Sequence, residues 1–224
     1  MSERSPRERL IAAAIELFDE LGFDAVSVDA IAQRAGVGRT TLFRLFGSKE
    51  GLVFPDHETL LNRVQLRLSA STADTALTAV VEAARLVFVH YLEEGELARA
   101  RWRLTSSVPA LRDREVASVE RYVRVFRRYL FEHLPDGPNA ALRAELLATA
   151  VVATHNHVLR RWLRAESSQP LDDFSAAMST TLDLFGRVPE RSTAVMIFET
   201  DEPLELVLPR VRKALGKTET ESAT

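Results

Sequence analysis

Apolar residues three and four positions apart dominate the chain, whereas alternation with a period of two is nearly absent. In residues 7–21 this spacing puts four apolar side chains on one stripe: Ile11, Ala14, Phe18 and Leu21. Such a stripe is typical of a helix that packs one face on a core. Gly22 comes next, where a glycine commonly ends a helix. The pattern predicts a helix over residues 7–21.

Two short helices are expected next, joined by a glycine-containing turn. Ser27 is a suitable N-cap and Gly36 a suitable terminator, so a second helix should lie between them. The turn continues through Val37 and Gly38 into a third helix at residues 39–46. Two short helices joined in this way form a helix-turn-helix candidate.

The next helix should be interrupted early. Ser48 can cap a fourth helix, but Pro55 lies about two turns further on. A proline there removes a backbone hydrogen bond and clashes with the preceding turn. We therefore expect a kink or break near Phe54, with Asp56 as a new N-cap.

The rest of the chain continues as amphipathic segments separated by turn signals containing Gly, Pro, Ser and Asp. The expected segments are 74–93, 96–106, 112–134, 139–165 and 170–187. The sequence thus predicts an all-α fold of about nine helices. We divide it into a helix-turn-helix domain (1–50), a larger helical domain (51–187) and a partly disordered C-terminal extension (188–224).

Composition and the ends of the chain narrow the class of protein. With 46% hydrophobic and 27% charged residues, the chain has an ordinary globular composition. It contains no Cys, which excludes disulfides, thiolate metal sites and Cys nucleophiles. No run approaches 18 uncharged apolar residues, and residues 1–9 lack the apolar core of a signal peptide. We expect a soluble, cytoplasmic protein without a membrane segment.

Enzyme and metal chemistry find no support in the sequence. There is no GxSxG, phosphate-loop or GxGxxG pattern, so we expect neither an enzyme nor a cofactor. His155 and His157 are two apart and would point in opposite directions from a helix. His57 begins HETL, which lacks the second His of a zinc-protease motif. Metal binding is not expected.

Charge changes sign near the predicted helix-turn-helix. The net charge is −3, yet residues 33–49 hold three Arg and one Lys without an acid. Leu42 and Phe46 should face the core, which leaves a mostly polar outer face on the third helix: Arg39, Thr40, Phe43 and Arg44. Gly38 has no side chain at the start of this helix, so backbone N–H groups could approach a phosphate. The pattern indicates a DNA-binding helix.

Residues 16–37 (ELFDELGFDAVSVDAIAQRAGV) followed by GRTTLFRLFGSKEGL resemble the TetR family of bacterial transcriptional repressors. The resemblance covers about 50 residues and implies a role for each matching position. Base edges would be contacted by Arg39, Thr40 and Arg44, since Arg suits guanine and a Thr methyl suits thymine. The DNA backbone would be contacted by Ser27, Thr41, Phe43 and Lys49. Relatives usually carry Tyr at the position of Phe43, so the operator cannot be inferred from them.

The family resemblance also implies a ligand-binding and dimerisation domain that follows the helix-turn-helix domain (residues 1–50, called the reading head below). A two-fold dimer would read a palindromic operator. The last two long helices should form its interface through residues at helical spacing: Leu142, Leu146, Ala150, Phe174, Met178, Thr181 and Phe185.

A small-molecule pocket should lie among the middle helices. Five aromatic residues could line it, although each is more often plain core: Phe88, Tyr91, Trp102, Tyr122 and Phe126. Residues 97–128 hold nine Arg against three acids, which is more typical of a solvated helix surface with scattered ion pairs. The alternative is an anionic ligand with one of four arginines at the pocket mouth: Arg99, Arg103, Arg121 or Arg124. Residues 98–116 are similar to actinobacterial family members that sense fatty acyl-CoA.

Two modes of regulation remain open. In the first, a small-molecule ligand shifts the dimer away from the DNA-binding state and so relieves repression, with the Pro55 break as the joint. In the second, a protein partner acts through the C-terminal extension and no small molecule is involved. A continuous cavity among the middle helices would favour the first.

Overall fold

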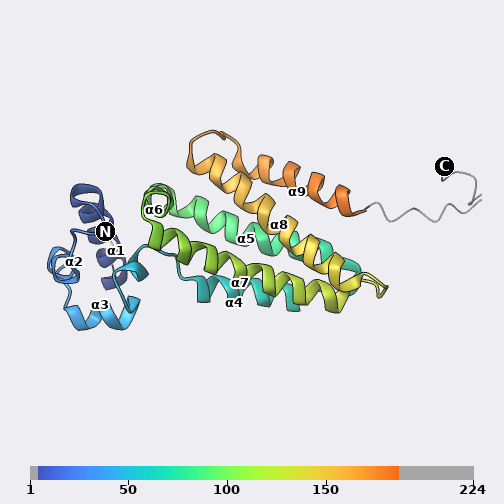
Figure 1. Cartoon of the computed structure of the whole chain (residues 1–224), viewed down its shortest axis with the longest axis horizontal. Coiled ribbons are helices and arrows are strands. Elements are labelled where there is room, and N and C mark those ends of the chain that lie inside the picture. Colours follow the sequence, from blue (N-terminus) through green and yellow to red (C-terminus); the bar gives the residue numbers. More distant parts are fainter. Residues whose placement is uncertain (1–4, 187–224) are drawn as a thin grey trace, which may run out of the picture. The chain divides into compact units, whose positions relative to one another are not determined.

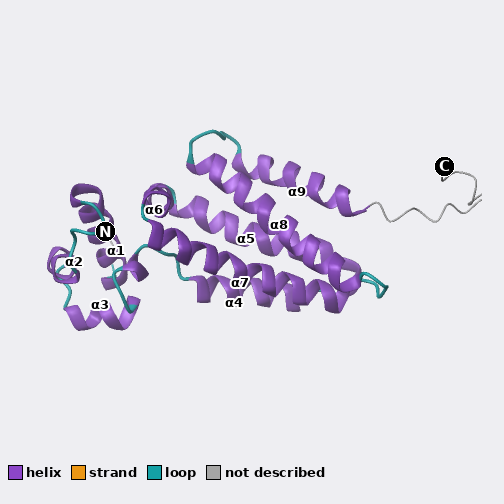
Figure 2. Ribbon diagram, viewed as in Figure 1, coloured by secondary structure: helices purple, strands orange, loops and turns teal. Residues whose placement is uncertain are grey.

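The computed structural model describes residues 5–186. This range contains nine α-helices and two short 3-10 turns and no strand (Figures 1 and 2), so the predicted all-α fold is confirmed. The predicted extension at 188–224 lies outside the described residues. The helices are α1 (Pro6–Leu21), α2 (Val28–Ala35), α3 (Arg39–Phe46), α4 (His57–Ser69), α5 (Ala76–Glu94), α6 (Glu96–Ser107), α7 (Pro109–His133), α8 (Ala140–Leu163) and α9 (Pro170–Gly186).

The first three helices begin and end at the residues that the sequence pattern indicates. The Ser27 hydroxyl caps α2 by accepting a hydrogen bond from the backbone N–H of Ala30 at 3.1 Å. Gly36 then takes a left-handed conformation (φ 61°), which favours glycine and turns the chain toward α3. Leu10, Phe18, Ile31 and Leu42 meet in one buried cluster, so the three helices share a core.

The break at Pro55 is also confirmed. Instead of a fourth helix, a single 3-10 turn, η1 (Glu50–Leu52), follows α3. After the buried Pro55, the Asp56 carboxylate caps α4 by accepting from the backbone N–H of Thr59 at 3.1 Å. This hydrogen bond, with further help from Arg7, lowers the pKa of Asp56.

The remaining helices form a bundle around α5. This helix is apolar enough, by length and composition, to cross a membrane. In the fold it packs against α4, α6, α7, α8 and α9, which accounts for its apolar sequence. Fully buried side chains such as Ala79, Ala83 and Phe88 form the centre of the second core cluster.

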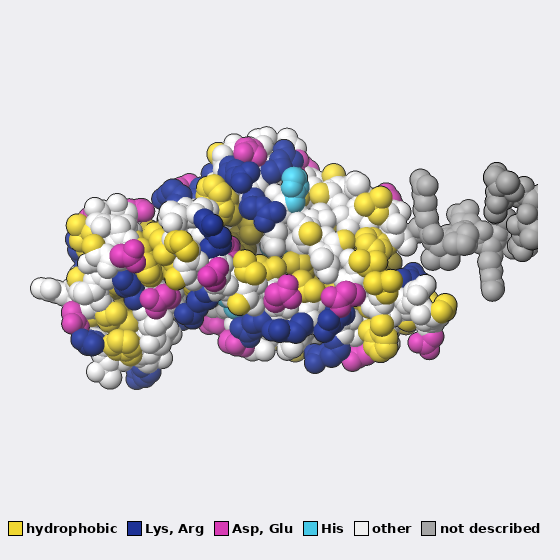
Figure 3. Space-filling model, viewed as in Figure 1, with side chains coloured by type: hydrophobic (Ala, Val, Ile, Leu, Met, Phe, Trp, Pro, Cys, Tyr) yellow, Lys and Arg dark blue, Asp and Glu magenta, His cyan; other side chains and the backbone are white. Residues whose placement is uncertain are grey.

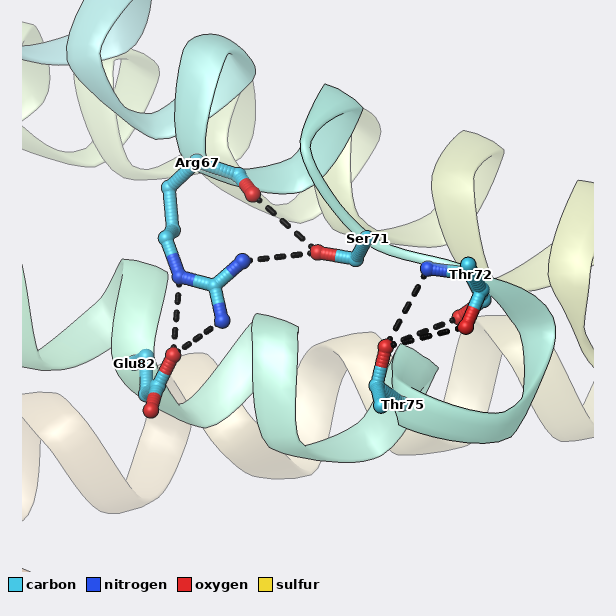
Figure 4. A network of polar contacts seen from close by, with 5 residues as sticks. All are labelled: Arg67, Ser71, Thr72, Thr75 and Glu82. Carbon is cyan, nitrogen blue, oxygen red and sulfur yellow. Dashed lines mark hydrogen bonds and ion pairs between the residues drawn. The ribbon is translucent and has the colours of Figure 1, made fainter.

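A polar network fixes the connection between α4 and α5 (Figure 4). The Arg67 guanidinium donates to the Ser71 hydroxyl at 2.7 Å and also pairs with Glu82 on α5. Thr72 and Thr75 cap the turn between the helices through reciprocal hydrogen bonds. The two helices are thereby held antiparallel by side chains at their shared end.

One glycine should be indispensable for the junction between α3 and η1. A Cβ atom at Gly51 would lie 2.1 Å from the carbonyl oxygen of Phe46, whereas one at Gly137 would meet nothing within 4 Å. We expect Gly51→Ala to lower the free energy of unfolding by about 1–3 kcal/mol, as overpacking does elsewhere. Urea denaturation followed by circular dichroism measures this, with Gly137→Ala as the control. Equal stability of the two variants would contradict the prediction.

Candidate DNA interface and ligand cavity

The outer face of α3 is exposed as predicted. Leu42 is fully buried, while Leu45 and Phe46 are partly buried against the same core. The exposed side chains on the opposite face are Arg39, Thr40, Phe43 and Arg44, with Thr41 half-buried beside them. Gly38 forms the N-cap of α3 with open space around it, so its backbone is accessible to a phosphate.

Arg39 is held by a neighbour within the reading head. Its guanidinium lies 2.9 Å from both carboxylate oxygens of Asp29 on α2 and 5.4 Å from the centre of the Phe43 ring. Both Arg39 and Asp29 are exposed, so the pair is accessible to solvent and contributes little to stability. Arg44, by contrast, forms no ion pair with another residue in the described part of the chain.

Lys49 has a structural role that the sequence reasoning missed. Its ammonium donates to the carbonyl oxygens of Phe23 and Val26, at 2.8 and 3.0 Å, and lies over the Phe23 ring. It thereby fastens the loop before α2 to the turn after α3. Ser27, the other predicted backbone contact outside α3, is exposed at the N-terminus of α2. The DNA contacts of both residues stay predictions.

Arg34, one of the three arginines of residues 33–49, forms ion pairs within the protein. Its guanidinium pairs with Glu20 at 3.2 Å and with Glu16 at 3.5 Å, both on α1. Hydrogen bonding to Glu20 raises the pKa of Arg34 above its ordinary value. The residue connects α2 to α1 rather than extending the exposed face of α3.

A cavity lies among α4, α5, α7 and α8. Its volume is about 60 Å³. Because a buried water needs about 10–15 Å³, the cavity has room for a few waters or a small ring compound. Most of the lining is Ala, Val, Leu and aromatic carbon, and the polar side chains are His57, Glu115, His155 and Asn156.

The two histidines of the cavity are uncharged at neutral pH. Burial lowers the pKa of His155 to about 4, and the same effect, aided by Arg121 and Arg101, lowers that of His57 to about 4. His57 Nδ1 is 3.1 Å from the Tyr122 hydroxyl, and His155 Nδ1 is 3.1 Å from the Asn156 side-chain oxygen. Each imidazole is thus oriented by a neutral partner.

Of the six residues predicted to bind a ligand, three line the cavity: Tyr91, Tyr122 and Phe126. The other three do not. Phe88 is fully buried and stacks on Phe174, with ring centres 4.9 Å apart. Trp102 lines an adjoining depression at the surface, which shares Glu115 and Asn156 with the cavity. Arg103 is exposed and pairs with Asp19 on α1 at 3.6 Å. Sequence reasoning missed His57, His155 and Asn156 as cavity residues. His155 and Asn156 carried a signal, since they are polar residues beside the apolar Val152 and Leu159 of α8.

The residues predicted for dimerisation divide in the same way. Phe174 and Met178 are 1% exposed, and Thr181 lies inside too, bonded through its hydroxyl to Thr154 at 2.7 Å. These three side chains cannot form an outer face, and Phe185 is half-buried against the same core. On α8, Leu142 and Leu146 are half-exposed and Ala150 is partly exposed.

Leu184 on α9 is 77% exposed, and the sequence reasoning missed it. α9 runs beside α8 (Figure 1), and small side chains such as Thr149, Ala153 and Ala176 are exposed on the two helices. A helix face of small and apolar side chains is typical of helix–helix interfaces.

The reading head and the bundle share a core. Leu104 from α6 and Leu111 from α7 are buried in the same cluster as the side chains of α1–α3. Arg7 on α1 pairs with Asp56 at 3.7 Å, next to His57, which lines both the cavity and a polar depression on the side of α1. A change at the cavity wall therefore has a direct route to α1.

Basic side chains form a row on one part of the bundle surface. Figure 3 shows a row of basic side chains along the part of the bundle formed by α4 and α7. Arginines of α7 are paired with acids of neighbouring helices, as in Arg121 with Glu58 at 2.5 Å and Arg127 with Glu145 at 2.8 Å. Among residues 5–186, no group of three or more His, Asp or Glu side chains could hold a metal ion.

Comparisons with known proteins agree with this architecture. Residues 10–54 match the family model described as bacterial regulatory proteins of the tetR family. The chain is 29% identical to the putative mycofactocin biosynthesis transcriptional regulator MftR of Mycobacterium tuberculosis over 165 aligned residues. The aligned region covers 73% of this chain and 83% of MftR. The chain is also 29% identical to the transcriptional activator FasR of Mycolicibacterium smegmatis, over 80% of this chain and 81% of FasR.

Among solved structures, the SmeT–triclosan complex superposes with a TM-score of 0.58 at 18% identity, over 89% of this chain and all of SmeT. That likeness shows the fold. The sequence relatives are transcriptional regulators rather than enzymes. The motif around α3, the family model and the fold agree: the chain belongs to the TetR family of bacterial regulatory proteins and is a DNA-binding transcriptional regulator.

Proposed function

We propose that this regulator binds a palindromic operator in the cytoplasm as a homodimer, acts as a repressor, and is released by a small molecule held in the cavity. The observation that carries the proposal is the position of His57. It is a wall of the cavity and also the first residue of α4, directly after the Pro55 break and the Asp56 cap. Occupation of the cavity can therefore act on the junction with the reading head.

The reading role rests on the exposed face of α3. Arg39, Thr40 and Arg44 would reach base edges. Gly38, Thr41 and Phe43 would contact the phosphates. Ser27 and Lys49 would also contact phosphates, through the donor groups that they do not use in hydrogen bonds within the protein. Lys49 can spare one of its three N–H groups, because the other two are bonded to carbonyls.

The dimer would form through α8 and α9. Leu142, Leu146 and Leu184 present exposed apolar side chains there. An isologous interface between two copies would bury them against their symmetry mates and place two α3 helices about one turn of DNA apart.

Ligand control is favoured over control by a protein partner. A cavity exists among the middle helices, as the first mode of regulation requires. The partner alternative depends on residues 188–224, which lie outside the described range. An acyl-CoA-like anion finds less support, since the cavity is small and three of the four expected cations, Arg99, Arg103 and Arg121, pair with acids instead.

Arg44 should carry sequence-specific binding. We expect Arg44→Ala to weaken operator binding by about 1–3 kcal/mol, because it removes a base contact. Fluorescence anisotropy with DNA from upstream of the regulator's own gene, at several salt concentrations, measures the loss. Arg34→Ala is the matched control, since that arginine is occupied by Glu16 and Glu20. If both variants bind like the wild type, Arg44 does not read bases.

The proposed dimer face makes a separate prediction. Leu146→Arg should convert the dimer to a monomer at micromolar concentration, because it would bury charge at the interface. Leu66→Arg on α4 is the control, as Leu66 is 70% exposed and lies on another helix. Sedimentation equilibrium distinguishes the states. A dimeric Leu146→Arg variant would place the interface elsewhere.

The joint at Pro55 can be tested without a ligand. Replacing Pro55 by Ala favours helix continuation by about 3 kcal/mol and should let η1 and α4 merge. We expect weaker operator binding with the fold retained, because the α3 helices would no longer match the half-site spacing. Anisotropy titrations compare it with Pro135→Ala, in the loop after α7. Operator affinity equal to that of the control would rule out the joint.

A further inference from the structure

We propose that the cavity takes a compact, uncharged and largely apolar molecule with a single hydroxyl or carbonyl group. This inference rests on the proposed function, because the same cavity would hold the effector. It goes further in naming the chemistry of that effector and in excluding an anion.

The charge of the lining is the first argument. The residues around the cavity, all within the described range, include no Lys or Arg. Their one carboxylate, Glu115, is exposed at the rim and lies near Arg112 and Arg160. An anion moved past this rim into the interior would lose its hydration without meeting a cation among the lining residues, which is unfavourable.

Three arginines of the bundle are paired with acids outside the cavity. Buried Arg101 pairs with Glu94, which also lies near His90. Arg121 pairs with Glu58, and Arg99 pairs with Glu96 at 3.4 Å while covering the Trp162 ring. Freeing any of them to bind an anion would leave an acid unpaired.

The polar groups inside are neutral and of both hydrogen-bonding kinds. His155 is 7% exposed, and its Nε2 atom has no hydrogen-bond partner in the described structure. The Tyr122 hydroxyl is shared with His57, and the Tyr91 hydroxyl belongs to the same lining. An unpaired polar atom in an apolar interior is costly, so a ligand that supplies one hydrogen bond there gains affinity.

The imidazoles of His155 and His57 are also neutral around pH 7. Because burial keeps the pKa of His155 near 4, the group carries no charge at pH 7 that could attract a carboxylate or a phosphate. His57 behaves in the same way. The site thus offers orientation without electrostatic attraction, and the apolar walls supply most of the binding free energy.

Three compounds on one aromatic skeleton test the proposal: 2-naphthol, 2-naphthoate and 2-naphthylmethylammonium. Isothermal titration calorimetry on the full-length protein at pH 7.5 gives their affinities. We expect 2-naphthol to bind at least about tenfold more tightly than either ion. The inference is overturned if an ion binds as tightly as 2-naphthol, or if none of the three binds.

A pair of Tyr→Phe variants on α7 examines the polar part of the site. Tyr122→Phe removes the hydroxyl bonded to His57 inside the cavity, whereas Tyr129→Phe removes a buried hydroxyl that does not line it. We expect Tyr122→Phe to weaken 2-naphthol binding about three- to tenfold and to leave naphthalene binding unchanged. If the two variants weakened 2-naphthol binding equally, the proposal that the ligand carries a hydroxyl or carbonyl group at this site would be refuted.

The same compounds added to the protein–operator complex separate this inference from the proposed function. Tight 2-naphthol binding without DNA release would leave the cavity chemistry standing and refute control by cavity occupation. If 2-naphthoate bound more tightly than 2-naphthol and released the DNA, control by cavity occupation would stand and the proposed uncharged ligand would be refuted. Fluorescence anisotropy of labelled operator gives this second measurement.

Discussion

The structure depends on the burial of Leu42. A helix of two turns with two adjacent threonines does not form by itself, because nucleation costs more than so few hydrogen bonds return. α3 exists because Leu42 is fully enclosed in the core shared with α1 and α2 and because Gly51 lets the following chain pass against the carbonyl of Phe46. With its inner face buried in this way, α3 leaves its outer face exposed. The core contact and the exposed surface are two sides of one short helix.

The junction at Pro55 connects that helix to the bundle. Proline stops one helix, Asp56 starts the next, and His57 then forms part of the cavity wall. Three consecutive residues thus meet three different environments. Leu104 and Leu111 add an apolar connection, because they belong to the core of the reading head. Small displacements at the cavity can reach α1 through both routes, since packed cores move as units rather than deform continuously.

The sequence predicted the fold better than the sites. Helix limits followed from local signals such as Ser27, Gly36 and Pro55, which act on the backbone of their own neighbourhood. Which aromatic lines the cavity depends on how four helices pack, and no local pattern separates Tyr91 from the fully buried Phe88. The same limit applies to α9, where helical spacing located a face but did not indicate that it points inward.

The pair between Arg39 and Asp29 has a consequence for the protein before it meets any partner. The guanidinium lies 2.9 Å from both carboxylate oxygens, so the long Arg39 side chain is already ordered against α2. A side chain that is ordered beforehand loses less conformational entropy when it forms another contact. Because the pair is exposed and contributes little to stability, Arg39 can exchange Asp29 for another acceptor at small cost. Preorganisation and easy release thus come from the same intramolecular contact.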